Sequence, residues 1–132
     1  MFRKAVLGHD DANRILKAAI DEAQRQGWTV AIAVCDDGGH PLGLARLDAC
    51  APISAYIATE KARTAALGRR ESKGYEEMVN GGRTAFVTAP LLTPLEGGVP
   101  IIVEGQVVGA VGVSGVKADQ DALIAKAGVA AL

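Results

Sequence analysis

Aromatic residues and cysteines are scarce in this sequence, and neither sign of charge is in clear excess. Only 4% of the 132 residues are aromatic, and two are cysteines. Fourteen Lys and Arg residues stand against fifteen Asp and Glu residues, which gives a formal net charge of -1. A balanced charge provides no strong positive field for nucleic acid or an anionic membrane, so we expect neither partner.

Long hydrophobic runs are also absent. The only early apolar run covers residues 5–7, which is far shorter than the core of a signal peptide. No stretch approaches the roughly 20 apolar residues of a transmembrane helix. We therefore expect a soluble, cytoplasmic protein, and its length predicts a single domain over residues 1–132.

The few metal-binding residue types are widely spaced. Cys35 and Cys50 have no metal-ligand spacing, so we expect buried free thiols. His9 and His40 are the only histidines, and neither has a partner at the spacing of a zinc site, which predicts no protein metal site. A single axial haem ligand requires no local motif, so both histidines stay candidates for that role, with plain surface histidines as the alternative.

Hydrophobic residues make up 49% of the chain although aromatic residues make up only 4%. The apolar surface therefore comes from Ala, Val, Ile and Leu. Periodicity predicts helices over residues 10–26, 52–67, 72–79 and 119–132. Asp10 or Asp11 could cap the first helix, Gly27 could end it, and Ser72 could cap the third. Apolar and β-branched runs joined by turn residues predict two β-hairpins, 28–35 with 41–48 and 99–103 with 107–113. Pro90 and Pro94 in segment 83–96 exclude a long helix there and allow at most a short or edge strand. This order indicates an α+β fold, with helices on an antiparallel sheet.

The stretch EGGVPIIVEGQVVGAVGVSG holds a dense set of glycines. Gly109, Gly112 and Gly115 are spaced three apart, and no Gly-Lys-Ser/Thr follows, so neither a dinucleotide fingerprint nor a P-loop is present. We expect strands whose glycines let another backbone or a ligand approach closely. The consecutive Gly97 and Gly98, followed by Val99, could offer converging N–H groups to an anion, or could simply form a turn before a strand.

A charged cluster interrupts the second predicted long helix. Glu60, Arg63 and Thr64 lie within one turn, and Glu60 shares a helical stripe with Ile53 and Ile57. A solvated surface pair is the ordinary interpretation. If the stripe is buried, however, Glu60 needs a partner or a raised pKa, and either condition marks a candidate site. No nucleophile elbow and no second catalytic group are evident, so enzymatic activity stays undecided.

These segments together resemble a known family. AIAVCDDGGHPLGLARLD, EKARTAALGRRE and LEGGVPIIVEGQVVGAVGVSG are similar to stretches of the GlcG-like proteins, which belong with the haem-binding protein HbpS and the C-terminal domain of PduO. The resemblance covers nearly the whole chain after residue 10. It implies a profilin-like α/β sandwich with a five-stranded antiparallel sheet, flanking helices and homo-oligomers.

The resemblance also implies two kinds of ligand. One hypothesis is an accessory protein of glycolate metabolism that binds a small hydroxycarboxylate such as glycolate. Arg63 would bind the ligand carboxylate, and Glu60 would accept a hydrogen bond from the ligand hydroxyl. The site would be completed by Thr64, Gly97, Gly98 and Val99. No cofactor would then be required. The alternative is a haem-binding or haem-degrading protein that uses His9 or His40. A third reading is an oligomeric accessory subunit of an oxidase.

Overall fold

The computed structural model describes all 132 residues as an α+β fold with four helices and one sheet. The helices are α1 (His9–Gln26), α2 (Ile53–Gly68), α3 (Lys73–Asn80) and α4 (Ala118–Val129), and a short 3-10 helix, η1, covers Thr84–Thr88. The strands are β1 (Ala31–Asp36), β2 (Pro41–Arg46), β3 (Gly98–Val103) and β4 (Gln106–Ser114). The predicted hairpins and helices are all present, with ends shifted by a few residues.

The sheet has four strands in the order β2-β1-β4-β3, and every neighbouring pair is antiparallel. The expected five-stranded sheet is therefore wrong. Segment 83–96, which contains Pro90 and Pro94, forms η1 and irregular backbone instead of a further strand, because proline cannot donate to a sheet ladder. β1 is central, as its uninterrupted apolar sequence predicts, and its register pairs Ala31 with both Arg46 and Ser114.

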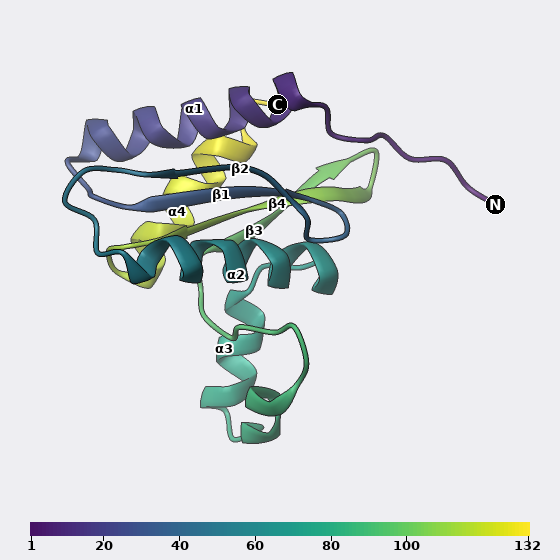
Figure 1. Cartoon of the computed structure of the whole chain (residues 1–132). Coiled ribbons are helices and arrows are strands. Elements are labelled where there is room, and N and C mark those ends of the chain that lie inside the picture. Colours follow the sequence, from purple (N-terminus) through teal and green to yellow (C-terminus); the bar gives the residue numbers. More distant parts are fainter.

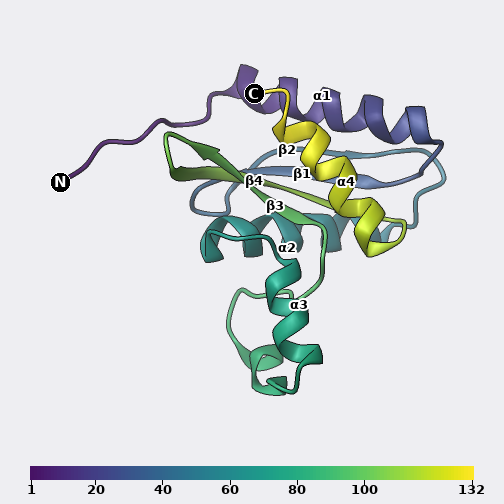
Figure 2. The same cartoon turned by 180° about the vertical axis from the view of Figure 1, so that it is seen from behind.

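The helices cover both faces of the sheet. α1 and α4 lie on one face and α2 lies on the other, while α3 and η1 project from the body beyond α2 (Figures 1 and 2). On the α1 and α4 face, the core consists of large side chains such as Ile15, Ile32, Val111 and Ile124, all fully buried. None of the helices combines the length and hydropathy of a transmembrane segment.

The face beneath α2 is built almost entirely from alanine. Its buried cluster contains two cysteines and seven alanines: Ala31, Ala33, Cys35, Cys50, Ala58, Ala62, Ala65, Ala66 and Ala110. Gly112 lies directly under the helix, since a Cβ built there would come within 2.0 Å of the Ala58 carbonyl oxygen. A similar atom on Gly98 would lie 2.2 Å from the Lys61 carbonyl oxygen. The backbone of α2 therefore rests on the sheet, as the glycine spacing led us to expect.

Two predicted helix caps are made differently in the structure. α1 begins after Gly8, and Asp11 accepts the Gly8 N–H at 2.9 Å from within the first turn. Ser72 precedes α3 but does not cap it, because its hydroxyl donates to the Leu95 carbonyl and accepts the Gly98 N–H at 2.8 Å. Ser72 thus fastens the start of β3 to the end of α2.

Candidate functional site

The predicted pair of Glu60 and Arg63 is present. The Arg63 guanidinium donates to the Glu60 carboxylate, and each side chain is about one third exposed, at 31% and 36%. The Arg63 stem lies against the β1–β2 turn, where a Cβ on Gly39 would meet Arg63 Cγ at 2.7 Å. The Arg63 Nε atom is buried and has no hydrogen-bond partner. One donor of this guanidinium is therefore unsatisfied inside the protein.

The other predicted ligand groups lie on the opposite flank of α2. Thr64 is buried, donates to the Glu60 carbonyl at 2.8 Å and accepts the Thr93 N–H at 2.8 Å. Gly97 and Gly98 lie beside Lys61, and the Gly98 N–H is already bonded to Ser72. Val99 is paired with Val111 inside the sheet. The structure does not bring these groups together with Arg63, so the six residues form no single concavity.

The stripe that carries Glu60 faces outward. Ile53 is 62% exposed and Ile57 is half-buried, while the neighbouring Tyr56 is 76% exposed and Leu67 is 42% exposed. The buried face of α2 carries alanines instead, because its backbone lies too close to the sheet for larger side chains. Glu60 therefore sits at the solvent edge, and its burial, which would have marked a tuned carboxylate, is not found.

A groove between β2 and α2 lies along this outward stripe. It has a volume of about 560 Å³ and a mainly apolar lining. β2 contributes Pro41 and Leu44 to the lining, on the face of the sheet that carries α2. The start of α2 contributes Pro52, Ala55 and Tyr56. Arg46 and Glu60 are the charged residues of the lining. Leu44 is 51% exposed, so large apolar side chains meet solvent here.

The two histidines occupy separate places. His40 precedes the groove residue Pro41 and lies 3.1 Å from an Asp36 oxygen, with 78% of its side chain exposed. His9 begins α1, on the other face of the sheet, and its side chain is 79% exposed. The only aromatic side chain in the groove lining is Tyr56, which the sequence reasoning did not single out. No cluster of three or more His, Cys, Asp or Glu residues could hold a metal ion.

The sequence reasoning also missed a buried ion pair. Lys61 of α2 and Asp121 of α4 are 5% and 3% exposed, and Lys61 fills the space beside Gly97. Lysine is among the residues least often buried, so its position in the sequence gave no sign of this role. Gly97, where the sequence allowed either an anion-binding concavity or a plain turn, thus lies next to an ammonium that already has two protein partners.

Comparisons with known proteins agree with this fold. The family model "Haem degrading protein HbpS-like" matches residues 7–130. The Escherichia coli protein GlcG is 68% identical over 114 residues, which cover 86% of this chain and 85% of that protein. A double mutant of HbpS from Streptomyces reticuli is 29% identical with a TM-score of 0.91, covering 100% of this chain and 90% of that one.

A complex of PduOC with haem has a TM-score of 0.86 and covers 97% of this chain and 96% of its own. Its sequence is 24% identical to this chain, so it supports the shared fold alone.

Proposed function

This chain belongs to the HbpS-like family, and on that premise we propose that it binds haem, or a similarly flat and largely apolar carboxylate, in the groove between β2 and α2. The observation that carries the proposal is the groove itself. Its volume of about 560 Å³ lies within the range of small-molecule and cofactor sites. The groove exposes the apolar side chains of Leu44 and Tyr56 to solvent. Exposed apolar surface of this kind is typical of a ligand-binding groove.

The groove residues fit the chemistry of haem. Leu44, Pro52 and Ala55 would cover the apolar ring, and the Arg46 guanidinium would bind a propionate through charge-assisted hydrogen bonds. Tyr56 carries a phenol oxygen, which is an established axial ligand of haem iron, as is histidine. His40 directly precedes the groove residue Pro41, so it remains a candidate ligand, whereas His9 belongs to α1 on the other face of the sheet. Bound haem would supply a redox-active iron.

Haemin titration followed by absorbance tests this proposal. We expect a saturable Soret change in the parent, and an affinity at least about tenfold weaker in Leu44→Asp, because a carboxylate would be buried against the ring. Leu123→Asp is the matched control, since Leu123 is 55% exposed on α4. Equal haemin binding by Leu44→Asp and the parent would contradict the proposal. Tyr56→Phe, His40→Ala and His9→Ala would identify the axial ligand from the ligated spectrum.

A small hydroxycarboxylate such as glycolate is the second candidate, and the unsatisfied Arg63 Nε favours it. A ligand carboxylate would satisfy this buried donor, and the Glu60 carboxylate would accept a hydrogen bond from the ligand hydroxyl. Calorimetric titration should then give saturable heat with glycolate and little with acetate, and Arg63→Ala should lose the glycolate signal. Glycolate binding by Arg63→Ala that equals the parent's would exclude this site.

A further inference from the structure

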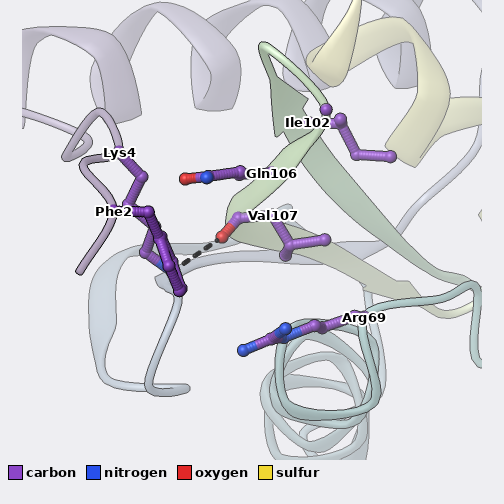
Figure 3. A pocket seen from close by; sticks show the side chains of 7 residues that line it. Phe2, Lys4, Arg69, Ile102, Gln106 and Val107 are labelled. Atoms are coloured by element: carbon purple, nitrogen blue, oxygen red, sulfur yellow. Dashed lines mark hydrogen bonds between the residues drawn. The ribbon is translucent and has the colours of Figure 1, made fainter.

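A second cavity lies far from the groove, between the N-terminal segment, the tip of the β3–β4 hairpin and the end of α2 (Figure 3). Its volume is about 320 Å³, at the small end of the range for ligand sites. Its lining includes Phe2, Lys4, Arg69, Ile102 and Gln106. The cavity therefore combines two cations, one amide and apolar carbon.

The cations leave a single uncompensated positive charge. Lys4 Nζ lies 2.6 Å from an Asp37 carboxylate oxygen and donates to the Val107 carbonyl at 3.2 Å. Arg69 is exposed and takes part in none of the ion pairs of the molecule. Since Asp37 balances Lys4, the Arg69 guanidinium remains to attract one negative group.

Arg69 is held in place by an unusual backbone conformation. It follows α2 with φ of 56°, and its N–H donates to the Ala65 carbonyl. A left-handed conformation is uncommon for a residue with a side chain and costs free energy. Glycine is the usual residue at such a position, and Gly68 stands one residue earlier. Arg69 therefore has a backbone conformation that is unfavourable for arginine. Residues in such conformations cluster at ligand-binding sites, which indicates a binding role for the Arg69 guanidinium.

Gln106 adds an unsatisfied acceptor. Its Oε1 atom is buried and has no hydrogen-bond partner. A buried acceptor that stays unpaired destabilises the folded protein, because it has lost its hydrogen bonds to water. The amide and the Arg69 guanidinium extend toward the same side of the cavity, where Phe2 and Lys4 lie (Figure 3). A ligand that brings a donor to Gln106 and an anionic group to Arg69 would satisfy both.

The surrounding charges select the kind of donor. An ammonium group would lie close to Lys4 and Arg69 and would be repelled, whereas a hydroxyl carries no charge. We propose that this cavity binds a small hydroxycarboxylate, with its carboxylate on Arg69, its hydroxyl donating to Gln106 Oε1 and its carbon atoms against Phe2 and Ile102. This inference is independent of haem binding. It shares a ligand class with the second candidate above but names a different site.

A paired titration tests the inference, with glycolate and acetate as probes and two-dimensional NMR as the readout. The parent should bind glycolate more tightly than acetate, and the Gln106 side-chain amide signals should shift with glycolate. Gln106→Leu should reduce glycolate affinity to that of acetate and leave acetate unchanged. Arg69→Asn should weaken both by about tenfold or more. Asparagine is chosen because it tolerates the left-handed conformation better than alanine.

One control variant and one discriminating variant separate this site from its neighbours. Arg70→Asn removes the next guanidinium, which lies over the Tyr75 ring at 4.8 Å and belongs to another contact; it should bind as the parent does. Arg63→Ala is not a control but distinguishes the two candidate glycolate sites, because it removes the guanidinium of the site beside Glu60 and leaves the Arg69 cavity intact. Loss of binding in Arg63→Ala alone would overturn this inference and support the other site. A parent that shows no preference for glycolate over acetate would also overturn it.

Discussion

Lys61 Nζ lies 3.0 Å from Asp121 Oδ2, and this buried ion pair joins α2 to the first turn of α4. Lys61 also donates to the Val113 carbonyl at 2.9 Å, and Asp121 accepts the Val116 N–H at 3.2 Å. Burial is the largest influence on Asp121 and raises its pKa, while the Lys61 ammonium opposes that rise. Each charge is therefore buried with specific partners. Removing either side chain would leave the other charge buried and unpaired, which would destabilise the folded protein.

Lys61→Met should lower the free energy of unfolding by about 3–5 kcal/mol, because Asp121 would stay buried without its cation. The double variant Lys61→Met, Asp121→Leu should recover part of this loss, since it leaves no buried charge. Urea denaturation at neutral pH measures both. A loss below about 1 kcal/mol in Lys61→Met would contradict the prediction, because such a value is typical of a surface pair.

Gly112→Ala should be strongly destabilising. The new methyl group would meet the α2 backbone at 2.0 Å, and neither the helix nor the central strand can move without disturbing the alanine layer. We expect a loss of about 3 kcal/mol or more. Gly43→Ala is the matched control in the same sheet, because its methyl group would meet only a Leu16 side chain at 3.3 Å. Similar denaturation midpoints for the two variants would show that α2 does not rest on Gly112.

The Cys35 thiol should be unreactive in the folded protein. Burial raises its pKa to about 12, so at pH 8 only about one thiol in ten thousand is the reactive thiolate. In a Cys50→Ala background, an alkylating reagent should label Cys35 slowly in buffer and rapidly in urea, as read by mass spectrometry. Rapid labelling in buffer would mean that this core layer opens easily.

Asp11 should make stability depend on acid pH. The hydrogen bond from the Gly8 N–H, with help from Arg14, lowers the pKa of Asp11 below its usual 3.8. A depressed pKa in the folded state stabilises the protein above the unfolded value, and this contribution disappears as the pH falls through the folded value. Asp11→Asn should therefore lower the melting temperature at pH 7, and its difference from the parent should shrink as the pH falls below 3.8. Asp10→Asn, which keeps the Gly8 bond, is the control.

Local pattern was sufficient to predict the helices and hairpins. Gly27 ends α1 in the left-handed conformation as its position indicated, and the central place of β1 followed from its continuous apolar run. The expectation of a fifth strand came from resemblance, whereas the local sequence predicted two hairpins and allowed at most a short or edge strand beside Pro90 and Pro94. The strand count was thus wrong where resemblance was preferred to local chemistry.

The candidate site was less predictable, because it depends on which side of α2 meets which strand. Helical spacing was enough to place Glu60 beside Arg63. It could not show that Gly97 and Gly98 lie across the helix, since that arrangement arises from tertiary packing. The groove was missed because Leu44 and Tyr56 are far apart in sequence and each is an ordinary residue alone. Gln106 and Arg69 are also far apart in sequence, and only the tertiary fold brings them to the lining of one cavity.

The pairing of β1 with β4 has a consequence for synthesis of the chain. Ala31 is paired with Ser114, so the two central strands come from opposite ends of the sequence. β1 and β2 leave the ribosome first, and the apolar edge of β1 has no partner until β4 follows. Pairing strands so distant in sequence is slow, because a long loop must close before any contact forms. A nascent chain that stalls before residue 106 therefore presents an open, aggregation-prone strand edge to the cell.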